Sequence, residues 1–151
     1  ILPLFRLASR GVFPVFNSRS RLSLIHVRDL VTGVVAAAQK GRIGEYYFLT
    51  HPEPVDAQEL PRIFGDALDR RVRSLQVPTG LLKAAAAVSE AWGRFSGKMP
   101  VFNRDKVREL TAREWVCDWE KARRDTGFRA ETDLNEGLTE TARWYRQHEW
   151  L

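Results

Sequence analysis

The sequence has a single cysteine, Cys117, and only three histidines. One cysteine excludes a disulfide within the chain and predicts a reducing, cytoplasmic location. The three histidines, His26, His51 and His148, are too far apart to show metal-ligand spacing. No segment approaches the roughly 18 consecutive apolar residues of a membrane span. We therefore expect neither a metal site nor a membrane partner.

Motifs of a self-contained active site are missing as well. The ten glycines are scattered, so the chain has neither a dinucleotide-binding fingerprint nor a phosphate-binding P-loop. Cys117 has no adjacent base in the sequence that could activate its thiol. We expect no catalytic residue in this chain.

The composition is that of an ordinary globular domain, with 44% hydrophobic and 28% charged residues in a chain of 151. The net charge of +5 permits an anionic partner. The basic residues are dispersed, however, and aromatic residues are not interleaved with them as in a stacking platform for bases. We expect solvated surface charge rather than a nucleic-acid site, and steep salt dependence of binding would reveal the alternative.

The pattern of elements is α/β up to Val77 and nearly all helical afterwards. Apolar spacing predicts helices over 29–40, 60–68 and 81–92, then from Asn103, Asp118 and Asp133 onward, with Asp29 and Asp133 as N-caps. Strands are expected over 22–27 and 45–49 and, weakly, over 71–77, with a loop over 12–16. Helical spacing is already present in the first residues, Ile1, Leu4, Phe5 and Ala8. This predicts that the sequence begins in the middle of a secondary-structure element; a processed terminus is the alternative.

The run Glu45-Tyr46-Tyr47-Phe48-Leu49 is apolar on both alternating faces. Such a strand is typical of a sheet that is covered on both sides. The chain offers few other convincing strands as neighbours, so this segment suggests that further sequence completes the sheet.

Several motifs together resemble the second half of extended short-chain dehydrogenases/reductases (extended SDRs). They are Leu24-Ile25-His26-Val27-Arg28-Asp29-Leu30, Gly44 to Leu49, Asp118-x-x-Lys121-Ala122 leading to Thr126-Gly127-Phe128, and Leu134-x-Glu136-Gly137-Leu138. Order and spacing match over essentially all 151 residues. The family includes NAD-dependent epimerases and dehydratases of nucleotide sugars, hydroxysteroid dehydrogenase/isomerases and dihydroflavonol reductases.

The resemblance implies that residues 1–151 are a C-terminal substrate-binding region whose N-terminal dinucleotide-binding Rossmann domain is absent. That domain would carry NAD or NADP and the Tyr-x-x-x-Lys pair of the family, and no tyrosine here has a lysine four residues later. No cofactor is expected for this chain alone. Residues 29–40 would be the last Rossmann helix and 45–49 the last strand, and both should expose apolar surface, through which the chain would self-associate.

The resemblance also suggests substrate-binding residues. Phe13, Pro14, Val15 and Phe16 resemble the loop that lies along the substrate, with a turn of core anchors as the alternative. Arg21 and Ser23 precede the His-Val-x-Asp motif. In the similar sugar-nucleotide epimerases, an arginine near this position binds a diphosphate. That arginine lies four residues before the histidine, whereas Arg21 lies five residues before it. Arg108, seven residues before Trp115, is similar to another diphosphate arginine and a pocket aromatic of those epimerases.

His26 and Asp29 are expected to be structural, the first through a local hydrogen bond and the second as a helix cap. The leading hypothesis for function is the substrate-binding part of an NAD(P)-dependent epimerase/dehydratase or reductase, inactive alone. Its small-molecule substrate would be a sugar nucleotide if arginines converge on the pocket, or a hydroxysteroid-like or flavonoid-like compound if the pocket is apolar. A non-catalytic binding or scaffold module of the same fold is the alternative.

Overall fold

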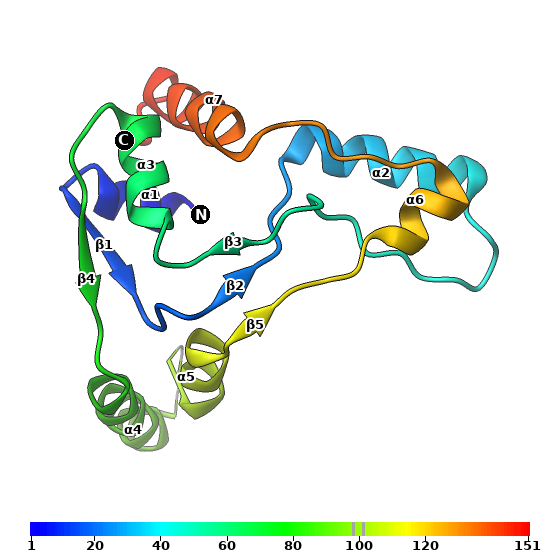
Figure 1. Cartoon of the computed structure of the whole chain (residues 1–151). Coiled ribbons are helices and arrows are strands. Elements are labelled where there is room, and N and C mark those ends of the chain that lie inside the picture. Colours follow the sequence, from blue (N-terminus) through cyan, green and yellow to red (C-terminus); the bar gives the residue numbers. More distant parts are fainter. Residues whose placement is uncertain (98, 101) are drawn as a thin grey trace.

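The computed structural model describes residues 1–97, 99–100 and 102–151, which form a predominantly helical chain with a few short strands (Figure 1). The helices are α1 (Leu2–Ala8), α2 (Val27–Lys40), α3 (Leu60–Leu68), α4 (Thr79–Ser96), α5 (Arg104–Thr111), α6 (Glu120–Thr126) and α7 (Leu134–Gln147). The strands are β1 (Val12–Val15), β2 (Arg21–Leu22), β3 (Val55–Asp56), β4 (Arg73–Gln76) and β5 (Glu114–Trp115). The expected fold class is confirmed.

The strands form two small sheets. In the first, β1 runs parallel to β4, with Phe13 opposite Ser74 and Val15 opposite Gln76. In the second, β2 lies between β3, which is antiparallel to it, and β5, which is parallel to it. The prediction of a loop over 12–16 is therefore wrong, because residues Val12–Val15 form β1. Its alternate residues Phe13 and Val15 are buried in the core. Pro14 lacks an amide proton and is tolerated because β1 has a described partner on one side only.

The main core lies between α1, α3, α7 and β1. Three aromatic contacts connect these elements: Phe5 to Phe64 with ring centroids 4.7 Å apart, Phe13 to Phe64 at 4.8 Å and Phe5 to Tyr145 at 5.3 Å. The remaining buried members are Ala8, Val15, Leu60, Ile63, Ala67, Leu68, Leu138 and Ala142. The helix predicted from the apolar spacing of residues 1–8 is thus present as α1, and it packs into this core.

The connection from β2 to α2 differs from the expected one. Strand β2 ends at Leu22, and α2 begins at Val27, so most of the strand predicted over 22–27 is absent. Helix α2 starts two residues before the predicted start at Asp29, and His26 occupies the N-cap position. The carboxylate of Asp29 instead accepts a hydrogen bond of 3.0 Å from the backbone amide of Thr132, which ties the first turn of α2 to the segment before α7.

The strand predicted over 45–49 is also wrong for this chain. These residues follow α2 as an irregular segment with no described strand pairing. A strand forms only when a neighbour satisfies its backbone groups, and no described strand lies alongside this segment. Tyr47 and Leu49 pack against Ala122 and Phe128, whereas Tyr46 and Phe48 are exposed.

Helix α2 exposes much of its apolar side, as expected for an element that is covered by another part of a protein. The exposed side chains are Val27, Leu30, Val31, Val34 and Val35. Ile43, Tyr46 and Phe48, which follow the helix in the sequence, are exposed as well. We call these eight residues the α2 face.

Candidate functional site

An open cleft of about 270 Å³ lies between β1, β2 and the α5–β5 connection. Its lining includes five of the eight predicted substrate-binding residues: Phe13, Pro14, Val15, Phe16 and Trp115. The structure thus brings the 13–16 segment and Trp115 together, although a hundred residues separate them in the sequence. The other lining residues are Leu4, Asn17, Ser20, Leu22, Ala57, Leu60, Glu109 and Leu110.

Backbone pairing holds Trp115 at the edge of the cleft. Strand β5 runs parallel to β2, so Trp115 lies opposite Leu22. The indole Nε1 of Trp115 donates a hydrogen bond of 3.0 Å to the carbonyl of Glu109. The residue remains 48% exposed, so its ring can contact a molecule in the cleft.

The few polar side chains of the cleft are already engaged elsewhere. The amide of Asn17 donates to the carbonyl of Thr111 at 3.0 Å, and the hydroxyl of Ser20 donates to the carbonyl of Ala112. The carboxylate of Glu109 pairs with Lys106 at 2.7 Å. The cleft therefore offers a molecule mainly apolar and aromatic surface.

Arg21, Ser23 and Arg108 do not line this cleft. Arg21 lies on β2 with an exposed side chain, in register with Asp56 and Glu114. The Arg108 side chain is 84% exposed and lies 3.5 Å from Asp105. Two arginines therefore do not converge on the cleft, and ligand contact through either one stays a prediction.

Ser23 has a structural contact. Its hydroxyl accepts a hydrogen bond of 3.0 Å from the backbone amide of Cys117, and its own amide donates to the carbonyl of Trp115 at 2.8 Å. These bonds extend the pairing of β2 with β5. Ser23 thus fixes the strand that carries the cleft tryptophan.

A second cavity, of about 310 Å³, lies where the β2–α2 connection meets α7, and His26 is among its lining residues. The Nδ1 atom of His26 is buried and has no hydrogen-bond partner among the described residues, so the local hydrogen bond expected for it is wrong for this nitrogen. The imidazole packs instead against Gly137, where an added Cβ would lie 2.9 Å from His26 Cδ2. This contact was not predicted from the sequence, where its only signal is a glycine inside a predicted helix.

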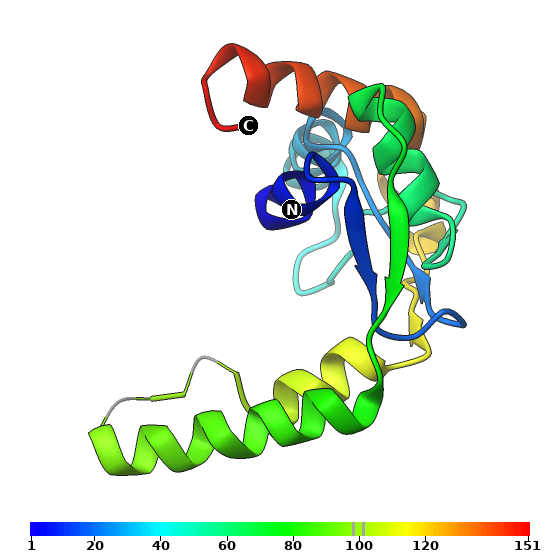
Figure 2. The ribbon, with the colours of Figure 1, turned by 90° about the vertical axis from the view of Figure 1, so that its left-hand side faces the viewer.

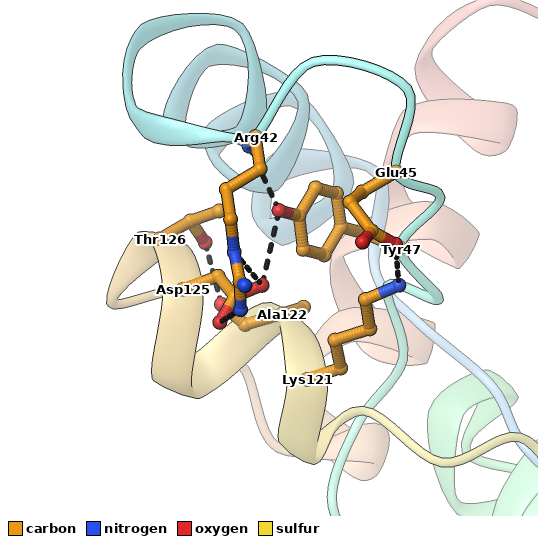
Figure 3. A network of polar contacts seen from close by, with 7 residues as sticks. All are labelled: Arg42, Glu45, Tyr47, Lys121, Ala122, Asp125 and Thr126. Atoms are coloured by element: carbon orange, nitrogen blue, oxygen red, sulfur yellow. Dashed lines mark hydrogen bonds and ion pairs between the residues drawn. The ribbon is translucent and has the colours of Figure 1, made fainter.

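A separate polar network ties the 42–47 segment to α6 (Figure 3). Arg42 forms a bidentate pair with Asp125 at 2.7 and 3.2 Å, and Lys121 pairs with Glu45. The hydroxyl of Tyr47 accepts from the amide of Arg42 at 3.0 Å and donates to Asp125 at 3.2 Å. Every charged group is paired with an opposite one, so the network holds the segment in place and leaves no free acid or base.

These pairs lower the pKa of two carboxyl groups. The hydrogen bond from Arg42 lowers the pKa of Asp125, and the hydrogen bond from Lys121 lowers the pKa of Glu45. A carboxyl group whose pKa is lowered by folding stabilises the fold above its unfolded pKa, and this stability is lost as the pH falls through the folded pKa. The hydrogen bond to Glu45 raises the pKa of Lys121. The stability that Lys121 contributes is therefore lost only at alkaline pH, as the pH rises through the pKa of this amine in the folded state.

We expect the melting temperature to fall as the pH drops below about 4, where free Asp and Glu titrate. Asp125→Asn should lower the melting temperature at neutral pH and flatten this acid limb, because it removes one of the responsible carboxylates. Circular dichroism melts across the pH range measure both effects. The control is Asp66→Asn, which removes an exposed i,i+4 pair with Arg62. Equal acid limbs in Asp125→Asn and the unmodified chain would contradict the assignment.

Two further features bear on ligands. Among the described residues, no group of three or more His, Cys, Asp or Glu side chains is placed to hold a metal ion. In the same part of the chain, no helix has both the length and the apolar character needed to cross a bilayer.

The fold is that of the C-terminal part of an extended SDR, as the similar proteins below show, which confirms the predicted resemblance. No protein-family model matches the chain. The chain is 29% identical over 152 residues to the ceramide reductase of Caulobacter vibrioides, covering 99% of this chain and 47% of that protein. It is 28% identical over 127 residues to the 4-hydroxy-2-methyl-3-oxo-4-farnesyl-3,4-dihydroquinoline-1-oxide ketoreductase of Stigmatella aurantiaca, covering 82% of this chain and 37% of that protein.

Solved structures share the fold. The structure of gox2253 matches with a TM-score of 0.71 at 23% identity, covering 99% of this chain and 44% of that chain. The dTDP-glucose 4,6-dehydratase DesIV of Streptomyces venezuelae, solved with NAD bound, matches with a TM-score of 0.64 at 22% identity. The match covers 97% of this chain and 38% of that chain. The chain therefore spans less than half the length of these relatives.

Proposed function

We propose that this chain forms the substrate-side wall of an NAD(P)-dependent reductase of the extended SDR type, acting on an apolar, lipid-like ketone or alcohol. The apolar cleft is the observation that carries the proposal. Its polar side chains are engaged by the protein itself, and Arg21 and Arg108 lie outside it. The similar reductases named for ceramide and for a farnesylated quinoline support the same substrate class.

The three tyrosines of this chain do not fit the catalytic acid of such an enzyme. Tyr46 is exposed on the α2 face, the Tyr47 hydroxyl is engaged by Arg42 and Asp125, and Tyr145 is buried in the main core. Proton and hydride transfer would therefore depend on a separate dinucleotide-binding half. The role of this chain would be to bind the apolar part of the substrate and to exclude water from it.

The α2 face is where this half would dock. Residues 29–40 would become the last helix on its sheet and residues 45–49 its last strand, which would give the backbone of 45–49 the neighbouring strand that it does not have among the described residues. A chain that keeps this face uncovered should self-associate, and solution scattering that shows a monomer would count against that expectation.

We expect calorimetric titration of the chain to show binding of a medium-chain methyl ketone and no binding of dTDP. Leu110→Arg should weaken ketone binding about tenfold or more, because it places a cation in the apolar cleft. Leu75→Arg is the matched control, since Leu75 is exposed on β4 outside the cleft. Binding of dTDP without ketone binding would instead support a sugar-nucleotide enzyme, the function suggested by the likeness to DesIV.

Titration with NAD(H) and NADP(H) separates the enzyme from the scaffold alternative. The full-length product of the gene should bind one of these cofactors, whereas the chain alone should bind neither. Cofactor binding by the chain itself would mean that the proposed division into two halves is wrong. Absence of cofactor binding in both would favour a non-catalytic module.

A further inference from the structure

Helix α4 carries a solvent-exposed apolar stripe that no described element covers. Leu81, Val88, Trp92 and Phe95 are 62%, 70%, 70% and 88% exposed, at a spacing that places them on one side of the helix. The opposite side buries Leu82 and Ala86 against Val107 of α5. The exposed side is therefore not needed to attach α4 to the rest of the chain.

The shape of the molecule makes this side accessible. Figure 2 shows α4 extending along the lower edge, well beyond the elements to which it is attached. From Leu81 to Phe95 the stripe is about 21 Å long at 1.5 Å per residue. The rings of Trp92 and Phe95 lie at its outer end with centroids 6.4 Å apart, and Met99, 92% exposed, follows them.

Exposed alanines widen the stripe into an arc, and basic residues border it. Projected at 100° per residue, Ala84, Ala87 and Ala91 extend the apolar side, and Lys83 and Arg94 follow at its edge. Residues 79–109 contain six basic and three acidic residues, so this segment carries a net charge of +3. A helix with a broad apolar side, aromatic residues and neighbouring cations is typical of a segment that lies in the interface of an anionic membrane.

A second copy of the chain fits this surface less well. The stripe has coiled-coil spacing, but the flanking positions 84, 89, 91 and 96 are alanines and serines, which supply no complementary charges. Pairing two copies would also bring two positively charged segments together. The α2 face, where the dinucleotide-binding half is proposed to dock, lies at the other end of the molecule in Figure 1.

We propose that α4 docks this protein peripherally on the surface of an anionic lipid bilayer. Leu81, Val88, Trp92 and Phe95 would enter the boundary between headgroups and acyl chains, and Lys83 and Arg94 would contact the lipid phosphates. The absence of a membrane partner expected from the sequence rested on the lack of a spanning segment, which surface binding does not require. The inference is independent of the proposed catalysis, because it rests on α4 and not on the cleft.

Co-sedimentation with vesicles tests the proposal. The chain should sediment with vesicles of phosphatidylcholine and phosphatidylglycerol, sediment weakly with phosphatidylcholine alone, and dissociate as salt is added. The double variant Trp92→Ser/Phe95→Ser should lose about tenfold or more in affinity. Lys83→Glu/Arg94→Glu should lose a similar factor for the anionic vesicles only.

Val31→Ser/Val34→Ser on α2 is the matched control, because it removes apolar side chains of comparable exposure from another surface. It should leave vesicle binding unchanged. All altered positions are exposed, so circular dichroism should show intact folding in each variant. The proposal is overturned if the unmodified chain does not sediment, if the α2 variant loses binding while the α4 variants keep it, or if the α4 variants only abolish self-association in the absence of vesicles.

Discussion

Replacing Phe5 with alanine is expected to lower the free energy of unfolding by about 3–5 kcal/mol, a large part of the stability of an ordinary domain. Phe5 is fully buried. Its ring contacts Phe64 of α3 at 4.7 Å and Tyr145 of α7 at 5.3 Å, so its removal opens a cavity where three helices meet. Urea unfolding followed by circular dichroism measures the change.

Phe95→Ala is the control for this experiment, because the same side chain is removed from a position that is 88% exposed. Its effect should stay within about 0.5 kcal/mol. Similar losses in both variants would show that the core between α1, α3 and α7 is not packed as described.

Replacing Gly33 with alanine is expected to destabilise the chain by about 1–3 kcal/mol through overpacking. An added Cβ would lie 2.8 Å from Phe128 and 2.9 Å from Leu49, which is closer than van der Waals contact allows. Helix α2 would have to move away from the small core around Phe128. Thermal melts measure the loss of stability, and near-ultraviolet circular dichroism reports the aromatic repacking.

Gly80→Ala provides a matched control within another helix. An added Cβ there has open space around it, so alanine should be neutral or should stabilise α4 by up to about 1 kcal/mol. If the two substitutions have the same effect, the close approach of α2 to Phe128 is not a constraint on the fold.

The features that the sequence predicts well are local ones. The cap of α7 is an example: Asp133 accepts hydrogen bonds from the amides of Asn135 and Glu136, which are two and three residues away. Asn103 caps α5 in the same way through the amide of Lys106. A cap needs only its own neighbours, so spacing can identify it, although Asp29, predicted as the cap of α2, accepts from Thr132 instead.

The features that the sequence does not predict depend on distant partners. Strand β1 is short and contains a proline, and it forms because Arg73–Gln76 lies beside it. The reverse holds for 45–49, whose apolar pattern is typical of a strand but whose partner strands are not among the described residues. The bidentate pair of Arg42 with Asp125 joins residues 83 positions apart and leaves no local signal.

The cleft shows the same division. Its 13–16 segment and Trp115 were predicted from a family resemblance, which carries tertiary information that composition lacks. Leu110 and Ala57 also line it and were not predicted, because an apolar residue on a helix or in a loop has no pattern that distinguishes a cleft from a core. The arginines were predicted by position relative to motifs, and such spacing does not fix the direction in which a long side chain extends.

The packing of α1 against α7 has a consequence for synthesis of the protein. Phe5 meets Tyr145, and Arg6 donates a hydrogen bond of 3.2 Å to the carbonyl of Trp150. Because translation adds α1 before α7, α1 lacks this contact until residues 134–151 have left the exit tunnel. Contacts so distant in sequence also close slowly in free solution. We therefore expect the core between α1 and α7 to form only once both segments have been made, with the apolar side of α1 available to chaperones until then.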